Sequence, residues 1–218
     1  ATEFVTELAG KKVPFVFIES KLPGTPYLAY YGMPVFESGY LGASLLLRNS
    51  APAEVACFRF HRSGDALSNT ASIRQDGFLH FIKQEKRACR LWVDYLYPSD
   101  CAQNTEILDR FFEAHPDIRH IIIFNSRAYI VAEYLQAHGM GYRILLGFDP
   151  LERNVKCMKS GYLDYIIAQK CETQAYRGVR ALCNLFVFKT TPASADNYMS
   201  MDILTAENVN YYIDLPNE

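Results

Sequence analysis

The chain has 218 residues, 50% of them hydrophobic, so it can bury one sizeable core or two smaller ones and is not expected to be disordered. Its formal net charge of −2 provides no basic surface for nucleic-acid phosphates, so binding to DNA would require a segment outside this sequence. No apolar run reaches the roughly 18 residues of a membrane span, and residues 1–20 lack a signal-peptide pattern, so we expect no membrane partner.

The cysteine pattern favours free thiols in a reducing compartment. No C-x-x-C pair occurs, and several cysteines lie in segments with the pattern of buried strands or helices. A disulfide framework is the alternative, since the number of cysteines is even. The six residues are Cys57, Cys89, Cys101, Cys157, Cys171 and Cys183.

The first fifty residues predict two short strands followed by a helix. Val13–Ile18 is a run of β-branched and aromatic residues, and a loop rich in proline and glycine separates it from an extended piece at Tyr27–Tyr31. Apolar residues at helical spacing then predict a helix over Phe36–Leu47, which ends in a polar segment.

The central part of the chain alternates apolar runs with amphipathic stretches, as repeated βαβ units do. Ile121–Phe124 is apolar at every position, which suits a parallel strand covered by helices on both faces. We therefore predict an α/β fold with a doubly wound parallel sheet. Its strands are Val55–Phe60, Leu91–Leu96, Ile121–Phe124, Ile144–Phe148 and Tyr165–Ala168, and a helix (Thr173–Phe188), a short strand (Met201–Leu204) and a polar-aromatic tail (Asn208–Ile213) follow.

Three of these strands each end in one hydrogen-bonding side chain. Asn125, Asp149 and Gln169 stand at carboxyl ends of strands, where ligands bind in open α/β sheets. For Asn125 or Asp149 alone, capping of the next helix is the simpler explanation. Gln169 is a poor cap, so a shared binding edge explains the set better.

Arg74 is a fourth candidate for this edge. The loop Arg62–Asp65 leads from the first central strand to a helix whose inner turn carries Arg74, and a guanidinium there could span two adjacent hydroxyls. An aspartate accepts hydrogen bonds from vicinal hydroxyls, and amide side chains both donate and accept. The four side chains together therefore suit a polyhydroxylated neutral ligand, a sugar.

Aromatic side chains near the same edge could stack against the C–H face of a sugar ring. The candidates are Tyr95, Tyr97 and Phe148. Core packing is the alternative for each of them, because the chain contains 15 tyrosines and 14 phenylalanines.

We expect no catalytic, metal or cofactor site. Gly139-Met140-Gly141 precedes a strand instead of opening a helix, which is the wrong context for dinucleotide binding. The five histidines lack metal-ligand spacing, and only His61 lies near the proposed edge, as a polar lining residue at most. An α/β enzyme is therefore the least favoured class, since the chain shows no nucleophile with a matching base.

Five stretches of the chain occur in the order found in one known family. Together they resemble the type 1 periplasmic-binding-protein fold, in the version of lactose-repressor-family (LacI family) transcriptional regulators. The resemblance implies a two-lobed module that binds a sugar-like ligand through Arg74, Asn125, Asp149 and Gln169. The stretches are Phe36–Ala43, Ile73–Phe78, Gly147–Asp149, Lys159–Asp164 and Ile167–Gln169.

The chain departs from the family pattern in three respects. Met33-Pro34-Val35 replaces a polar pair, and Ser126 stands where aspartate is common, so the bound sugar is expected to differ from familiar effectors. The family's helix-turn-helix, hinge helix and first three βα units have no counterpart here. We therefore expect a remnant of the N-terminal lobe, residues 1–50 plus 172–200, and a nearly complete C-terminal lobe, residues 51–171 plus 201–218.

The resemblance implies a cytoplasmic, homodimeric regulator. Its small-molecule effector, a sugar, would change lobe closure and so the binding of operator DNA by the missing helix-turn-helix. An exported sugar-binding protein or sensor ectodomain of the same fold is the alternative, because both classes share the pocket chemistry. The stretch Asn197–Thr205 resembles the cytoplasmic regulators more than the exported proteins.

Overall fold

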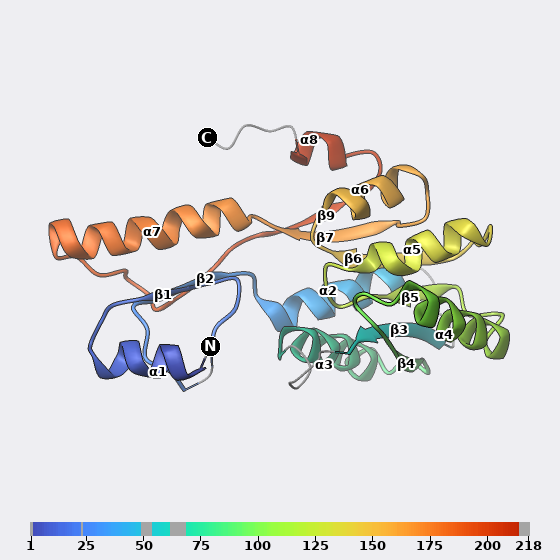
Figure 1. Cartoon of the computed structure of the whole chain (residues 1–218), viewed down its shortest axis with the longest axis horizontal. Coiled ribbons are helices and arrows are strands. Elements are labelled where there is room, and N and C mark those ends of the chain that lie inside the picture. Colours follow the sequence, from blue (N-terminus) through green and yellow to red (C-terminus); the bar gives the residue numbers. More distant parts are fainter. Residues whose placement is uncertain (1, 23, 49–53, 62–68, 214–218) are drawn as a thin grey trace. The chain divides into compact units, whose positions relative to one another are not determined.

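The computed structural model describes residues 2–22, 24–48, 54–61 and 69–213, which form two compact units (Figure 1). The first unit contains the described residues up to Pro34 together with Gln169–Met201. The second contains those from Val35 to Ala168 together with those from Asp202 onward. Among all of these, no helix combines the length and hydropathy that crossing a bilayer requires.

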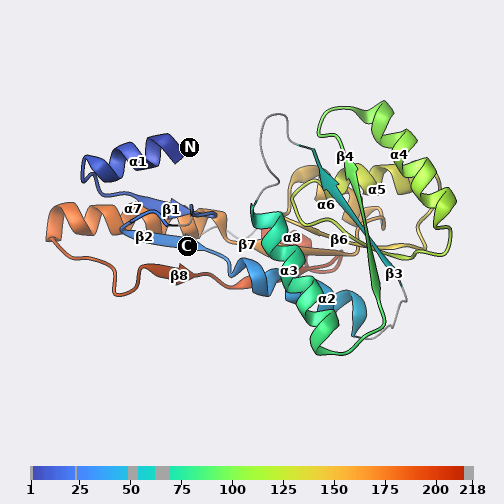
Figure 2. The same ribbon diagram turned by 90° about the horizontal axis from the view of Figure 1, so that it is seen from below.

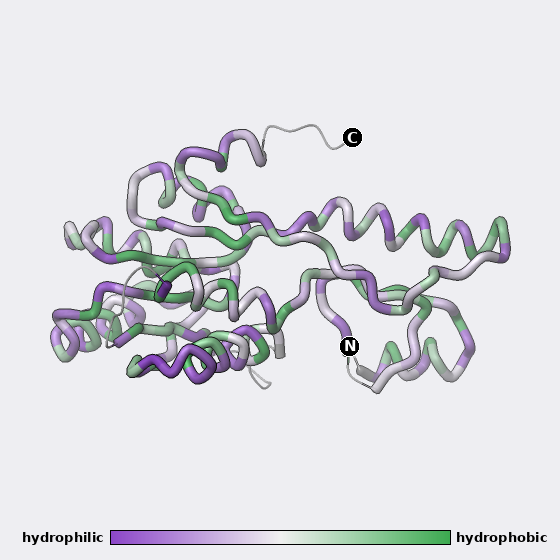
Figure 3. The backbone as a smooth tube through the Cα atoms, turned by 180° about the vertical axis from the view of Figure 1, so that it is seen from behind, coloured by the Kyte–Doolittle hydropathy of each residue, from purple (hydrophilic) through white to green (hydrophobic). Residues whose placement is uncertain are grey.

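A three-stranded parallel sheet is the centre of the first unit. Helix α7 (Cys171–Phe188) alternates hydrophilic and hydrophobic residues along its length, as an amphipathic helix does (Figure 3). The strands, in spatial order, are β1 (Val16–Ile18), β2 (Ala29–Gly32) and β8 (Asp196–Tyr198), and they lie between α1 (Thr2–Gly10) and α7 (Cys171–Phe188) (Figure 1).

An ion pair joins distant parts of the sequence within this first unit. Lys21 Nζ lies 2.7 Å from Asp196 Oδ2, and the Tyr27 hydroxyl donates a hydrogen bond to Asp196 Oδ1 at 2.7 Å. The bonds from Lys21 and Tyr27 hold the pKa of the Asp196 carboxyl below its ordinary value. The folded state therefore favours the charged carboxylate.

Replacing Asp196 by asparagine is expected to lower the free energy of unfolding at neutral pH by about 0.5–1 kcal/mol, because a partly exposed ion pair contributes little. Since folding lowers the carboxyl pKa, the wild-type advantage is fully present above the unfolded-state pKa near 3.8 and is lost as the pH falls through the lower, folded-state pKa. Urea unfolding of both proteins from neutral to acidic pH measures this, and a pH-independent difference contradicts it.

A six-stranded sheet is the centre of the second unit, in the order β4-β3-β5-β6-β7-β9. Neighbouring strands from β4 to β7 are parallel, and helices cover both faces, so the predicted doubly wound α/β fold is confirmed. The strands are β3 (Glu54–Phe60), β4 (Arg90–Leu96), β5 (His120–Ile122), β6 (Ile144–Phe148), β7 (Tyr165–Gln169) and β9 (Met201–Leu204).

Two helices, α2 (Val35–Leu47) and α3 (Asn69–Gln84), pack closely together on one face of this sheet (Figure 2). A Cβ atom on Gly39 of α2 would overlap the main-chain carbonyl of Arg74, and one on Gly77 of α3 would overlap the backbone of α2. Only glycine permits so close a backbone approach. This crossing fixes the position from which the Arg74 side chain extends.

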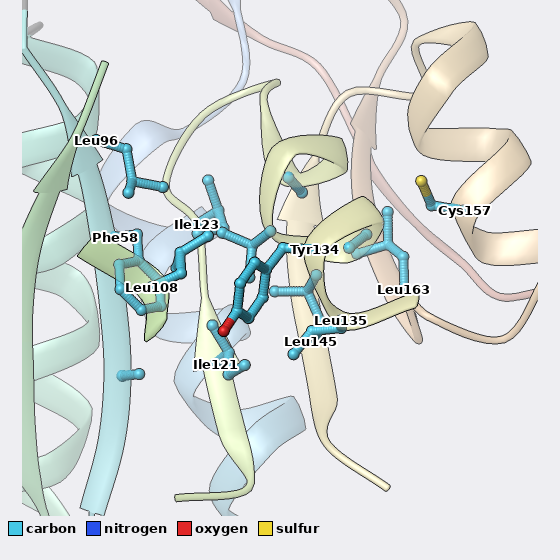
Figure 4. Packing of buried hydrophobic residues seen from close by; sticks show 14 of the residues in the cluster. Phe58, Leu96, Leu108, Ile121, Ile123, Tyr134, Leu135, Leu145, Cys157 and Leu163 are labelled. Atoms are coloured by element: carbon cyan, nitrogen blue, oxygen red, sulfur yellow. The ribbon is translucent and has the colours of Figure 1, made fainter. Parts of the chain in front are cut away.

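The opposite face packs against α4 (Cys101–Ala114), α5 (Ala128–Ala137) and α6 (Glu152–Lys159). Figure 4 shows strand residues of this cluster, including Phe58 and Leu145, together with helix residues, including Leu108 and Leu135. Burial of apolar surface at about 25 cal/mol per Å² makes this continuous cluster a main source of the unit's stability.

Two of the cysteines are core residues of the second unit. Burial raises the pKa of the Cys57 thiol to about 12 and that of the Cys157 thiol to about 11. Thiols with such values stay protonated at neutral pH and are poor nucleophiles. Both residues therefore act as small apolar side chains.

Several elements differ from the sequence-based prediction. β5 ends at Ile122, although Ile123 beyond it remains fully buried. Residues 208–213 do not form an irregular tail, because the buried side chain of Val209 anchors a short helix, α8 (Val209–Ile213), to the core. Strand β8 has no counterpart in the prediction, since three residues with two polar side chains show no strand pattern.

The boundary between the compact units also differs from the predicted division at residue 50. Helix α2 belongs to the second unit, because it packs against α3 and against the strands of the larger sheet. The assignment of the two units as lobes of a closing module remains a prediction.

Candidate functional site

A polar hollow of about 230 Å³ lies in the second unit, where β3 and β5 end. Its wall combines the end of β3, the first turns of α3 and the loop between β5 and α5. Ligands of open α/β sheets bind at such strand ends, so this hollow is the candidate site. Its lining residues are Phe58, Arg59, Phe60, His61, Ala71, Pro98, Phe124, Asn125, Ser126 and Arg127.

A second hollow, of about 370 Å³, lies in the first unit beside α7. Its volume is larger, and its wall comes mainly from α7 and the loop that follows this helix, including the exposed residues Arg177 and Arg180. None of the residues predicted to bind a ligand lines it. We therefore place the candidate site at the strand ends of the second unit.

Arg74 supports the floor of the candidate site instead of lining its wall. The residue is only 3% exposed, and its Nη1 donates a hydrogen bond to the carbonyl of Phe124 at 2.9 Å. The guanidinium carbon also lies 3.9 Å from the centroid of the Phe148 ring. Arg74 therefore holds the loop that carries Asn125 against the end of β6.

Asn125 shapes a turn and also lines the hollow. Its Oδ1 accepts a hydrogen bond from the backbone N–H of Arg127 at 2.9 Å, which shapes the turn into α5. The residue also lines the hollow and is partly exposed. The local capping interaction therefore leaves its amide donor facing a site where a ligand could accept from it.

The structure does not place Phe148 at the mouth of the site. Its side chain is fully buried, and the Arg74 guanidinium covers one face of the ring. In this conformation the ring cannot stack against a sugar, as was predicted from its place at a strand end, because it packs into the core.

Asp149 follows Phe148 in a backbone conformation that is uncommon for a non-glycine residue. Its φ is 62°, in the left-handed region that aspartate tolerates better than most residues. Its N–H donates to the carbonyl of Ile167 at 3.2 Å, and the side chain is partly exposed. The chain thus turns sharply at the end of β6, in a way typical of functional loops.

Asn154 is a residue that the sequence-based reasoning missed. It is fully buried in α6, and its Nδ2 lies 2.9 Å from the carbonyl of Ser126, 3.2 Å from that of Phe148 and 2.8 Å from that of Asp149. Its Oδ1 accepts from the N–H of Tyr129 at 2.8 Å. One side chain therefore ties together the loops after β5 and β6.

Tyr97 stands beside the site at the end of β4. Its backbone N–H and carbonyl both bond to the side chain of Asn104, at 2.7 Å each, so the loop before α4 is fixed. The His61 ring stacks on the Tyr97 ring with centroids 4.6 Å apart, and His61 itself lines the hollow. The two rings offer an aromatic edge to the site.

Gln169 ends β7 and belongs to the first unit. It is 4% exposed, and its Oε1 accepts a hydrogen bond from Gln174 Nε2 at 3.2 Å. Its Nε2 donates to Glu19 Oε1 at 3.4 Å, a long contact. Glu19 and Gln174, both in the first unit, therefore hold the side chain of Gln169, which was predicted to bind a ligand.

Arg59 is buried like Arg74, but the sequence-based reasoning did not identify it. Its Nη1 donates to Gln75 Oε1 at 2.8 Å and its Nη2 to Ser72 Oγ at 2.9 Å, so it joins β3 to α3. It lines the hollow and is 8% exposed. A charged residue inside an otherwise apolar strand was the signal that could have identified it.

The predicted loop Arg62–Asp65 lies outside the described residues. Within the part of the chain that the structure describes, no cluster of His, Cys, Asp and Glu is placed to hold a metal ion.

The chain is similar to a family of known proteins over most of its length. The family model described as a periplasmic binding protein domain matches residues 1–190. A solved structure, that of a candidate LacI transcriptional regulator from Bacteroides fragilis, is 34% identical with a TM-score of 0.89 and covers 97% of this chain and 73% of its own. No protein with a curated description matches.

Two other solved structures are similar at lower identity. GanP, a glucose-galactose binding protein from Geobacillus stearothermophilus, is 23% identical with a TM-score of 0.78, covering 99% of this chain and 75% of its own. A solute binding protein of an ABC transporter from Burkholderia graminis, in complex with D-arabinose, is 19% identical with a TM-score of 0.82. The match covers 96% of this chain and 73% of that protein's chain. At these identities the likeness shows the fold alone.

Proposed function

Because the chain belongs to the periplasmic binding protein domain family, we propose that it is the effector-binding domain of a LacI-type transcriptional regulator and that its effector is a sugar. The observation that carries the regulator assignment is the 34% identity to the candidate LacI regulator from Bacteroides fragilis over 97% of this chain. The domain acts by binding, with no catalytic step.

The geometry of the hollow supports a sugar ligand. Donors and acceptors from Arg59, Asn125 and Arg127 face one small space at the strand ends, next to the stacked rings of His61 and Tyr97. Such a mixture suits hydroxyl groups, which both donate and accept, while an aromatic edge suits the C–H face of a sugar ring. Sugar ligands named for the Burkholderia and Geobacillus proteins agree with this chemistry.

In the proposed mechanism, the sugar shifts the two units, as lobes, between an open and a closed state. In a cytoplasmic homodimer, this shift changes how DNA-binding segments outside the present sequence engage operator DNA. The net charge of the chain itself, −2, does not favour contact with DNA phosphates.

An exported sugar-binding protein is the second candidate, and the likeness to sugar-binding transport proteins favours it. Mass-spectrometric mapping of N-terminal peptides of the native protein distinguishes the two. Peptides of a helix-turn-helix upstream of Ala1 are the expected result. A mature N-terminus produced by removal of a signal peptide contradicts the regulator assignment.

Thermal unfolding in the presence of sugars tests the binding function. We expect at least one member of a panel of pentoses, hexoses and their acidic derivatives to raise the melting temperature, since a ligand at about 100 times its Kd stabilises the folded state by about 2.7 kcal/mol. The opposite enantiomer of the active sugar is the matched control and is expected to have no effect. If no sugar in the panel, neutral or acidic, stabilises the chain, the sugar assignment is wrong.

A further inference from the structure

Arg59 is a buried charge whose partners are neutral groups. The residue is 8% exposed, and its Nη atoms donate to the amide oxygen of Gln75 and the hydroxyl of Ser72. Its Nε is buried without a hydrogen-bond partner among the described residues. None of the ion pairs formed within the described part of the chain involves Arg59.

The surroundings of Arg59 in the hollow are basic. Arg127 and His61 line the same space of about 230 Å³, and no aspartate or glutamate is among the lining residues that the structure describes. The guanidinium has five N–H donors, of which two are used in the bonds to Gln75 and Ser72. Two arginines, Arg59 and Arg127, therefore border a space large enough for a small charged group and part of a ring.

A buried guanidinium without a counter-ion is costly, and an anionic group at the same place offsets that cost. Arginine binds carboxylates and phosphates through paired N–H donors, which gives geometric selectivity as well as charge. A neutral sugar hydroxyl at this position would leave the positive charge uncompensated. The site is therefore better matched to an acidic ligand than to the neutral polyol that its amide side chains suggest.

We propose that the ligand of this site is an anionic sugar, whose carboxylate or phosphate group binds Arg59 with Arg127 and His61 nearby. This inference rests on the proposed function, because it specifies the class of sugar that the same site takes. Arg59 would then be the residue that selects acidic over neutral ligands, while Asn125 contacts hydroxyl groups.

The test compares matched ligands on the full 218-residue chain by isothermal titration calorimetry. The probes are galactose, galacturonate, galactose 6-phosphate and inorganic phosphate, with parallel series for glucose and arabinose derivatives. We expect one acidic derivative to bind at least about tenfold more tightly than its neutral parent, and about a tenfold rise in salt to weaken only the acidic ligand. The uronate and phosphate arms identify which anion the site takes.

Arg59→Met provides the decisive variant. It is expected to bind the acid and its neutral parent with equal affinity, whereas Arg59→Lys keeps part of the preference and Arg110→Met, at an exposed position of α4, keeps all of it. Because Gln75 and Ser72 are partly exposed and can bond to water, the melting temperature of unliganded Arg59→Met is expected to be unchanged or raised.

Other outcomes separate this inference from the proposed function. If neutral sugars bind as tightly as their acids, or if Arg59→Met weakens both equally, the anion proposal is wrong and the sugar function stands. If inorganic phosphate binds through Arg59 while no sugar of either class binds, the anion site stands and the sugar function fails. If no acid or phosphate binds, the anion proposal is overturned.

Discussion

Asn154→Leu is expected to lower the free energy of unfolding by about 3–5 kcal/mol, one of the largest single-residue effects in the chain. Leucine has the same branching and the same number of side-chain heavy atoms, although it is bulkier, and it leaves the N–H of Tyr129 and the carbonyls of Ser126, Phe148 and Asp149 without their amide partner. Each buried polar group that loses its partner costs about 1–3 kcal/mol. The fully buried position of Asn154 leaves little room for water to replace those bonds.

Urea unfolding followed by circular dichroism measures this effect. Asn154→Asp tests the donor role of the amide directly. It keeps the shape of the side chain but replaces the amide group by a carboxylate, which faces three carbonyl oxygens and cannot donate to them. Asn210→Leu, at an exposed position of α8, is the matched control and is expected to change stability by less than about 0.5 kcal/mol. Equal stability of the Asn154 and Asn210 variants would show that the amide does not hold the two loops.

The sequence was sufficient for the architecture because the apolar runs have the lengths and periods that a doubly wound sheet requires. Ile121–Ile123 is buried on both faces, as its unbroken apolar pattern predicts, and α2 coincides with the predicted helix to within one residue. Short elements could not be predicted this way. β8 is fixed by its pairing with β2, and α8 by the burial of one valine, neither of which is a local signal.

The candidate site was only partly predictable, for a similar reason. Position at a strand end identified Asn125, which lines the hollow, and a place on the inner turn of the helix after the first central strand identified Arg74, which bonds to the carbonyl of the lining residue Phe124. The role of Asn154 depends on three carbonyls that converge from two loops, and such a convergence leaves no periodic trace in the sequence. Phe148 shows the converse error, since an aromatic residue at a strand end can turn into the core.

Arg74→Met is expected to weaken sugar binding by about 2–4 kcal/mol, which is roughly 30- to 700-fold in Kd. The guanidinium bonds to the carbonyl of Phe124 and so holds the loop that presents Asn125 to the hollow. Methionine can fill the space against the Phe148 ring through its thioether, but it cannot donate to that carbonyl. The loop then loses its support from below, and Asn125 no longer keeps its position.

Calorimetric titration with the active sugar, combined with unfolding of the unliganded proteins, tests this prediction. Unliganded Arg74→Met is expected to lose about 1–3 kcal/mol for the buried carbonyl of Phe124 that loses its donor, and its unfolding curve identifies the conditions in which the variant is folded when binding is measured. Arg110→Met, an exposed arginine of α4, controls for the loss of one positive charge. A Kd equal to that of the wild type would show that Arg74 stabilises the core alone, whereas weaker binding by a folded variant would establish that α3 supports the ligand site through this one side chain.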